Sequence, residues 1–288
     1  MSSLKEEDLI NILPKEGPSV AETIKYLEKY TEDFIVIKMG GSVLSNKDLF
    51  NNLILDIVIL KKLGLSIFLI HGGGSRISKK LDDLNIKSNF INGLRVTDDK
   101  IINIVEDVLV QFNKKIVDAL NNQSCGAKKI TSKKNNIITV QPENETLGFV
   151  GKPIKINTNT LIKIIKDKEV PVIASLGLDE NNQTFNINAD SVAGFIAKEL
   201  KARRLLILSD VEGVLNKDKK LIPEINSDQT KEMIMDGVIS GGMIPKIDNC
   251  LDVAKNGVKA VCIIDGRKNH SVLFELLSDK GSGTLIRE

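Results

Sequence analysis

The sequence predicts an α/β fold in which helices cover both faces of a mainly parallel β-sheet. Short uncharged runs of Ile, Val, Leu and Phe recur along the 288 residues, and segments with helical periodicity separate them. Several of these runs end in glycine-rich turns that lead into a helix. Aromatic residues make up only 4% of the chain and apolar residues 42%, so aliphatic side chains must fill the core. The length suits one large α/β domain or two lobes that share a sheet.

Composition argues against several classes of protein. The net charge is +2 with both signs spread along the chain, so we expect no nucleic-acid partner. Three distant cysteines and only two histidines predict neither a zinc site nor a disulfide framework; the cysteines are Cys125, Cys250 and Cys262. The first ten residues do not resemble a signal peptide, and no apolar run has membrane-spanning length. These features predict a cytoplasmic enzyme with no membrane partner.

Residues 1–33 are predicted to form a helical extension ahead of the sheet. Apolar residues recur there at spacings of three and four, which is typical of an amphipathic helix; they are Val20, Ile24, Leu27 and Tyr30. Such a helix either caps its own domain or docks on another subunit. The pattern alone does not decide between these two roles.

The first two predicted strands each end in a glycine-rich turn, and a helix connects them. Residues 34–37 lead to Lys38 and a Gly-Gly pair, and residues 66–70 lead to His71 and the three glycines at 72–74. Glycines allow a close approach of the backbone to a ligand, and a following helix start offers N–H groups to an anion. The spacing matches neither the dinucleotide-binding fingerprint nor the P-loop. A purely structural turn would show the same pattern.

A polar segment precedes the longest predicted helix. It contains Arg95, which is suited to clamp a carboxylate at two points, although an ordinary surface arginine is the simpler interpretation. Asp98 is a candidate N-cap for the helix that follows. Residues 124–155 then alternate between short apolar pieces and glycines, which predicts antiparallel hairpins over the site.

The segment Phe-Asn-Ile-Asn-Ala-Asp at 185–190 is more polar than a connection between a strand and a helix requires. Asn186 and Asn188 alternate with Ile187, so they share one face of an extended segment. Asp190 is either a plain N-cap or a functional carboxylate. Further predicted strands at 205–208 and 261–264 lead into the polar turns that follow them, and a glycine turn at 241–242 leads into another helix.

Together, these motifs resemble the amino acid kinase family, and within it the members that phosphorylate N-acetyl-L-glutamate. The Gly-Leu-Arg-Val-Thr-Asp motif separates those members from the aspartate, carbamate and uridylate kinases. The matching motifs occupy residues 38–41, 71–74, 93–98, 186–190, 208–211 and 241–246.

The resemblance implies a three-layer αβα sandwich with two lobes. Residues 34–185 would bind the acceptor, and residues 186–288 would bind ATP. The implied reaction is ATP-dependent phosphorylation of the side-chain carboxylate of N-acetyl-L-glutamate, a step of arginine biosynthesis. The implied cofactor is ATP with Mg²⁺ held on its phosphates and without direct protein ligands. The implied assembly is a homodimer, and further a hexamer built as a trimer of dimers.

The resemblance also implies roles for single residues. Lys38 and Lys246 would stabilise the transferring phosphoryl group, Asp190 would orient both lysines, and Gly41 would donate a backbone N–H. The implied substrate-binding residues are Gly73, Gly74, Arg95, Asn186 and Asn188. The implied ATP-binding residues are Ser209, Asp210, Val211, Gly213, Leu215 and Met243.

An allosteric arginine site is implied less firmly. Tyr26, His270 and Gly283 match the arginine pocket of ring-forming, arginine-inhibited members. Lys280, however, stands where those members have a glutamate that meets the cationic end of the inhibitor. Whether arginine inhibits this protein is therefore left open.

The implied chemistry agrees with the residues. A loose phosphoryl-transfer transition state requires positioning and positive charge, which two lysines and several glycine amides supply. A carboxylate acceptor is already ionised at neutral pH, so no general base is required. Two alternatives are a kinase for a carrier-linked aminoadipate or glutamate carboxylate, and a non-catalytic ATP or arginine sensor of the same fold.

Overall fold

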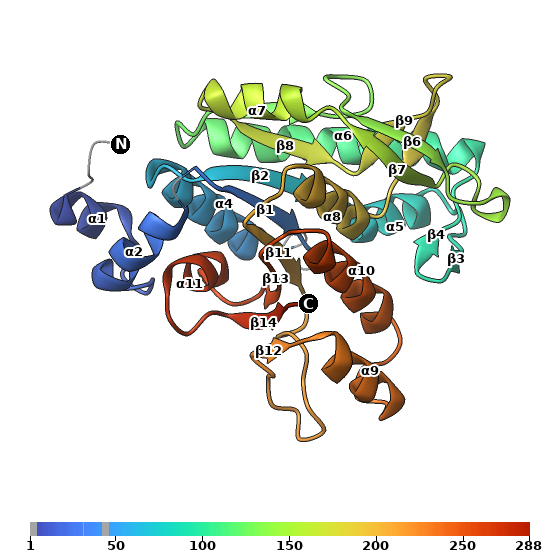
Figure 1. The fold of residues 1–288 in the computed structure, drawn as a ribbon. Helices are drawn as coiled ribbons and strands as arrows, with labels where there is room; N and C mark the ends of the chain where they lie inside the picture. Colours follow the sequence, from blue (N-terminus) through green and yellow to red (C-terminus); the bar gives the residue numbers. More distant parts are fainter. Residues whose placement is uncertain (1–4, 31, 42–45) are drawn as a thin grey trace.

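The computed structural model describes residues 5–30, 32–41 and 46–288. Within these residues, a central sheet has the strand order β12-β14-β13-β11-β1-β2-β8-β5 (Figure 1). Neighbouring strands run parallel, except that β13 and β14 are antiparallel. The strands are β1 (Phe34–Met39), β2 (Ser66–His71), β5 (Ala127–Ile130), β8 (Val170–Ala174), β11 (Arg204–Ser209), β12 (Glu224–Ile225), β13 (Ala260–Asp265) and β14 (Gly283–Ile286).

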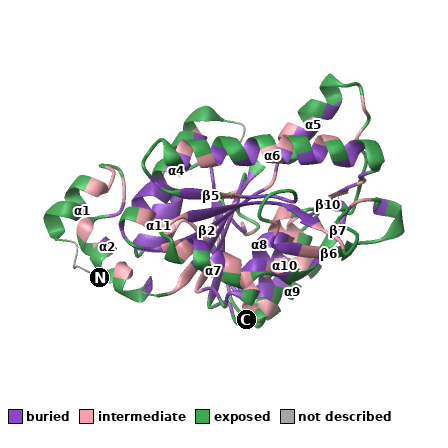
Figure 2. Ribbon diagram, turned by 90° about the horizontal axis from the view of Figure 1, so that it is seen from above, coloured by how far each residue is buried: buried purple, intermediate pink, exposed green. Residues whose placement is uncertain are grey.

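Helices cover both faces of this sheet, which confirms the predicted three-layer architecture. Successive strand residues pack to opposite sides: Ile35 and Ile37 join one apolar cluster, and Val36 joins the other. The first cluster contains residues of α4 (Lys47–Lys62), α6 (Asp99–Asn121) and α11 (Ser271–Leu277). The second contains residues of α7 (Thr158–Lys166), α8 (Ala189–Glu199) and α10 (Met243–Lys255). Figure 2 shows the buried sheet between the two helical layers. No helix in the described ranges is both long enough and apolar enough to cross a membrane.

A second sheet lies beside the carboxyl end of the first and has the order β10-β9-β6-β7. Its strands are β6 (Ile138–Pro142), β7 (Gly151–Ile156), β9 (Leu176–Leu178) and β10 (Thr184–Asn186). The prediction of antiparallel hairpins over 124–155 is correct for β6 and β7, between which the turn η2 (Glu145–Leu147) lies. It is wrong for β5, which pairs parallel with β8 at the edge of the main sheet. An edge strand and a hairpin arm both expose one side, so the local pattern could not separate them.

A small hairpin was missed by the sequence interpretation. It consists of the two-residue strands β3 (Phe90–Ile91) and β4 (Leu94–Arg95). The turn residues Asn92 and Gly93 both have positive φ, at 51° and 79°. Asn-Gly is the preferred sequence for such a turn, so this dipeptide was the signal that could have revealed the hairpin.

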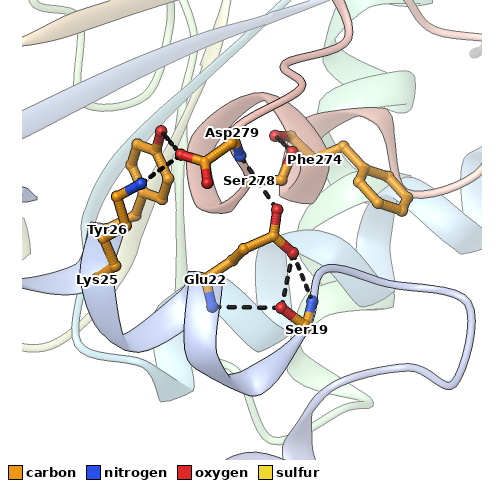
Figure 3. A network of polar contacts seen from close by, with 7 residues as sticks. All are labelled: Ser19, Glu22, Lys25, Tyr26, Phe274, Ser278 and Asp279. Carbon is orange, nitrogen blue, oxygen red and sulfur yellow. Dashed lines mark hydrogen bonds and ion pairs between the residues drawn. The ribbon is translucent and has the colours of Figure 1, made fainter.

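The N-terminal extension packs on its own chain. It contains α1 (Glu6–Ile12), α2 (Val20–Leu27) and the 3₁₀ turn η1 (Glu28–Tyr30), and α2 contacts α11. The predicted apolar stripe is not continuous, because Ile24 is 42% exposed and Tyr30 is buried outside the helix. Val20 and Leu27 still pack against the apolar cluster that contains α11. Polar contacts add to this packing at the end of α11 (Figure 3): Asp279 accepts hydrogen bonds from Lys25 Nζ at 2.6 Å and from Tyr26 Oη at 2.7 Å. These exposed contacts stabilise the docked position only modestly.

One buried amide holds the longest helix against the sheet next to the glycine turn. His71 ends β2, and complete burial lowers its pKa to about 4, so the imidazole is neutral. Its Nδ1 lies 3.1 Å from the Gly72 carbonyl and its Nε2 lies 3.0 Å from Asn113 Nδ2, which assigns the proton to Nδ1. Asn113, on α6, also has Nδ2 3.3 and 2.9 Å from the carbonyl oxygens of Ile130 and Val172, so its two hydrogens are shared among three acceptors. This one side chain therefore connects α6 to β2, β5 and β8.

Replacement of Asn113 by leucine should lower the free energy of unfolding by about 3 kcal/mol, because several buried acceptors would lose their donor. Urea denaturation measures this quantity. Asn103→Leu on the exposed side of the same helix is the matched control and should change it by no more than about 0.5 kcal/mol. Equal effects of the two substitutions would show that the buried amide contributes nothing specific.

Candidate active site

The candidate site lies at the carboxyl edge of the main sheet, where β1 and β11 are neighbours. The chain passes from β1 to β2 on one side of this point and from β11 to β13 on the other. Open parallel sheets bind ligands at such a reversal of strand order. A Cβ atom on Gly40 would lie 2.2 Å from the Leu208 carbonyl oxygen, so the backbones of the two strands approach closely here. Only glycine is accommodated at this position.

Two lysines from different elements meet one aspartate. Lys38, near the end of β1, lies with Nζ 2.8 Å from Asp190 Oδ1, and Lys246, in the first turn of α10, forms an ion pair with Asp190 Oδ2. All three side chains are largely buried. Burial acts to raise the pKa of Asp190, but the two ammonium charges outweigh it and hold the pKa at about 2. The carboxylate is therefore ionised and placed between two cations.

Asp190 is not the cap of its helix. Asn188 caps α8 and accepts hydrogen bonds from the N–H groups of Asp190 and Ser191 at 2.8 and 3.1 Å. The interpretation of Asp190 as a plain N-cap is therefore wrong. The cap at Asn188 leaves the Asp190 side chain available for the lysines.

Two helices begin at glycines near this cluster. The helix α5 (Gly74–Asp83) starts after Gly73, and α10 starts after Gly242; neither N-terminus has a capping side chain. The first N–H groups of such helices have no intrahelical acceptor and carry a partial positive charge. An anion placed there would be stabilised by the backbone as well as by the lysines.

All five predicted substrate-binding residues line one cavity of about 280 Å³. The residues singled out from the sequence that line it are Lys38, Gly41, Gly73, Gly74, Arg95, Asn186, Asn188 and Asp190. Lys246 does not line this cavity and reaches its edge through Asp190. Residues that the sequence interpretation did not single out, including Phe90 and Val150, complete the wall.

Arg95 lines the cavity, and the residue is only 6% exposed. It donates to the Gly74 carbonyl at 3.1 Å, to Ser78 Oγ at 2.8 Å and to Ser88 Oγ, and it lies 4.7 Å from the centre of the Phe90 ring. Burial lowers the pKa of the guanidinium. Among the described residues it forms no ion pair with a carboxylate, so its charge is suited to an anionic ligand. Ser78 and Ser88 gave no signal in the sequence, because their contacts with Arg95 are set by the tertiary fold.

The predicted nucleotide-binding residues lie outside this cavity. Ser209 ends β11 and is buried, and Gly213 in the following loop has a φ of 139°. A Cβ at Gly213 would lie 2.5 Å from Thr284 Oγ1, which also accepts a hydrogen bond from the N–H of Val214. Val211 and Met243 pack against the same apolar cluster. Asp210 and Leu215 lie in the loop that follows β11. Helix α9 (Ser227–Met235) comes later, after β12.

The residues predicted for arginine each have a partner of their own. Tyr26 donates to Asp279, and His270 Nδ1 lies 2.6 Å from Asp56 Oδ1. This hydrogen bond to Asp56 raises the pKa of His270. Gly283 lies in β14, where a Cβ would be 2.0 Å from the Ile263 carbonyl oxygen. In the part of the chain that the structure describes, no hydrogen bond joins the three residues to one another.

Comparisons with known proteins agree with this architecture. The profile described as the Amino acid kinase family matches residues 33–265. An acetylglutamate kinase from Pelagibacter ubique (strain HTCC1062) is 70% identical over 288 residues, which is 100% of both chains. Another, from Rhodospirillum rubrum, is 41% identical over 283 residues and covers 93% of this chain and 91% of that protein.

A solved structure shares the fold. The N-acetylglutamate synthase from Neisseria gonorrhoeae, complexed with coenzyme A and N-acetyl-glutamate, has a TM-score of 0.84 at 22% identity. The likeness covers 93% of this chain but only 62% of the synthase, so the chain spans less than two thirds of that protein. The matched profile, the 70% identical kinase and the shared fold lead to one assignment: this chain belongs to the amino acid kinase family.

Proposed function

We propose that the chain catalyses ATP-dependent phosphorylation of the side-chain carboxylate of N-acetyl-L-glutamate, in arginine biosynthesis. The 70% identical acetylglutamate kinase and the family membership support this activity. The observation that carries the proposal is the Lys38–Asp190–Lys246 cluster beside a cavity with the buried guanidinium of Arg95. Lys38 and Arg95 in the cavity lining, with Lys246 held beside it by Asp190, suit a substrate with two carboxylates, one of which receives a phosphoryl group.

In the proposed reaction, a carboxylate oxygen of the acceptor attacks the γ-phosphorus of ATP. The new bond joins that oxygen to phosphorus, while the bond from phosphorus to the β–γ bridging oxygen breaks and ADP leaves with its electron pair. The attacking carboxylate is ionised at neutral pH, so the chain does not have to remove a proton from it. Arg95 and Asn186 would hold the acceptor, with Arg95 on the carboxylate that does not react.

Lys38 and Lys246 would stabilise the negative charge on the transferring group. Such stabilisation is strongest when the charges are fixed before the reaction, and the Asp190 carboxylate fixes both. Backbone N–H groups of Gly41, Gly73 and Gly74 would add hydrogen bonds. In this assignment residues 34–185 bind the acceptor.

Residues 186–288 would bind the nucleotide. The end of β11, the loop after it and the start of α10 carry the residues assigned to ATP: Ser209, Asp210, Val211, Gly213, Leu215 and Met243. The described residues contain no group of three or more His, Cys, Asp or Glu side chains able to hold a metal ion. Since both oxygens of Asp190 face lysines, Mg²⁺ fits best as an ion carried on the ATP phosphates, where it would offset their charge.

The assembly proposed from the resemblance is a homodimer, with α1 and α2 joining dimers into a hexamer. The N-terminal extension, which projects from one end of the molecule, supports this assembly (Figure 1). Ile10 on α1 is 61% exposed and Ile24 on α2 is 42% exposed. Contact with another subunit would remove this apolar surface from water. The cytoplasmic location expected from the sequence stays a prediction.

A coupled ADP-release assay tests the activity. With ATP and Mg²⁺, we expect turnover on N-acetyl-L-glutamate and little on glutamate, aspartate or a carrier-linked glutamate. Arg95→Lys should raise the KM for N-acetyl-L-glutamate by about tenfold or more and leave the KM for ATP within about twofold, because an ammonium cannot grip a carboxylate at two points. Arg287→Lys, at an exposed ion pair with Glu224, is the matched control and should change neither.

The assay separates the competing functions. Preferred turnover of a carrier-linked substrate would assign the chain to the alternative kinase, and nucleotide binding without turnover would assign it a sensor role. A rise in the KM for ATP in Arg95→Lys would place Arg95 on the nucleotide side and overturn the assignment of the two lobes.

Light scattering tests the assembly. The full chain should have the mass of a hexamer, and deletion of residues 1–27, which keeps the buried Tyr30, should give dimers with turnover within about threefold of the full chain. Ile10→Asp together with Ile24→Asp should have the same effect without shortening the chain, because charge would enter the proposed contact. A full-length chain that runs as a dimer would refute the ring.

Arginine is added in a second set of these measurements, because the resemblance also implies an arginine site. Lys280 is exposed where an acid is expected, and Asp279 is the nearby acid, already paired with Lys25 and Tyr26. Loss of turnover on addition of arginine, abolished by Tyr26→Phe, would support the site.

A further inference from the structure

Thr97 occupies a buried position between the two elements that carry the acceptor-binding side chains. The hairpin β3–β4 has only two residues in each strand and pairs with neither of the larger sheets among the described residues. The position of this hairpin relative to β10 must therefore be fixed by contacts at the ends of the hairpin. Arg95 ends β4 and Asn186 ends β10, and Thr97 contacts both.

The Thr97 hydroxyl donates to the Arg95 carbonyl at 2.7 Å. The same oxygen lies 3.5 Å from Asn186 Nδ2, at the outer limit of a hydrogen bond in which it accepts. Thr97 has no exposed surface, so in the folded chain water does not reach its hydroxyl. One hydroxyl thus lies between the backbone of Arg95 and the side chain of Asn186.

Backbone hydrogen bonds close the same connection into a ring. The N–H of Thr97 donates to the Leu147 carbonyl at 3.0 Å, and the Thr97 carbonyl accepts from the N–H of Phe149 at 2.7 Å. The Phe149 carbonyl in turn accepts from the N–H of Asn186 at 2.9 Å. The path from Arg95 to Asn186 through Thr97 and Phe149 is therefore hydrogen-bonded at every step.

Gly148 allows this ring to close. Its φ is 66°, and a Cβ there would lie 2.4 Å from the Thr97 carbonyl oxygen. A side chain at this position would both strain the backbone and push residues 147–149 away from Thr97. Glycine at 148 therefore allows the backbone approach, and threonine at 97 supplies the hydroxyl.

We propose that Thr97 is a positioning residue that fixes the spacing between Arg95 and Asn186 and thereby sets the length of acceptor that the cavity accepts. The proposal rests on the function proposed above. In the proposed function, the Arg95 guanidinium binds the acceptor carboxylate that does not react. The distance from this guanidinium to Asn186 and Lys38 therefore determines which acceptor chain length fits the cavity. Among the described contacts of this connection, none involves the end of β11, the loop after it or the start of α10, which carry the residues assigned to ATP.

Thr97→Val removes the hydroxyl and keeps the shape of the side chain. We expect the KM for N-acetyl-L-glutamate to rise by about tenfold or more, with the KM for ATP and kcat within about threefold of the wild type. The ratio of kcat/KM for N-acetyl-L-glutamate over N-acetyl-L-aspartate, which is one methylene shorter, should fall by about tenfold. Thr97→Ser keeps the hydroxyl and should restore all of these values to within about twofold of the wild type.

Gly148→Ala provides an independent variant if Thr97→Val does not fold. It should reproduce the rise in acceptor KM and the loss of chain-length preference, because it displaces the loop from Thr97. Gly237→Ala is its control, since Gly237 has a similar φ of 70° but nothing within 4 Å of the added Cβ.

The outcomes are distinguishable from failure of the proposed function. A wild-type protein that does not phosphorylate N-acetyl-L-glutamate refutes that function. If the wild type is active, three results overturn the role of Thr97: an unchanged acceptor KM in Thr97→Val, equal rises in the KM for acceptor and ATP, or a serine variant that behaves like the valine variant. An unchanged chain-length preference in a folded Gly148→Ala variant also overturns it.

Discussion

Two ammonium groups lie close together at the carboxyl edge of the sheet, and the Asp190 carboxylate stabilises both of them there. Like charges in a site of low dielectric repel each other strongly, and each is costly to remove from water. Asp190 offsets both costs because each of its oxygens faces one lysine. Its own charge is secured in turn, since the lysines hold its pKa at about 2. Both cations are therefore held in place in this structure.

The sheet explains why these three residues meet. Lys38 lies near the end of β1, Asp190 lies in the first turn of α8, and Lys246 lies in the first turn of α10. The reversal of strand order between β1 and β11 brings these elements to one edge. The buried amide of Asn113 keeps α6 against the strand that precedes the second glycine turn. Packing on both faces of the sheet thus determines the geometry of the site.

Local features could be predicted from the sequence. The buried strands, the glycine turns and the Asp98 cap of the longest helix depend on neighbouring residues, and all are present. One wrong prediction concerned a choice between two neighbouring residues, and another concerned a strand whose partner only the tertiary fold decides. Asp190 was a possible cap until Asn188 was seen in that role, and β5 resembled a hairpin arm until its parallel partner was known. The amphipathic character of α2 stays a prediction: Val20 and Leu27 pack on the core, whereas Ile24 is 42% exposed.

In the candidate site, the charged residues could be predicted from the sequence, but the side chains that hold them in place could not. Lys38, Asp190 and Lys246 were assigned together through the family resemblance, and the structure brings them together. The partners of Arg95 could not be predicted, because Ser78 and Ser88 reach it only through the fold. The role of Thr97 depends on a loop more than forty residues away in the chain, and spacing in the sequence carries no trace of that contact.

The central claim is that Asp190 and its two lysines act as one unit in phosphoryl transfer. Measurement of kcat for Asp190→Asn, Lys38→Ala and the double variant tests this claim most directly. Each single variant should lower kcat by about a hundredfold or more, roughly 3 kcal/mol, and the double variant should be little worse than either. A folded Asp190→Asn variant whose kcat is within about threefold of the wild type would contradict the account, and so would losses that simply multiply in the double variant.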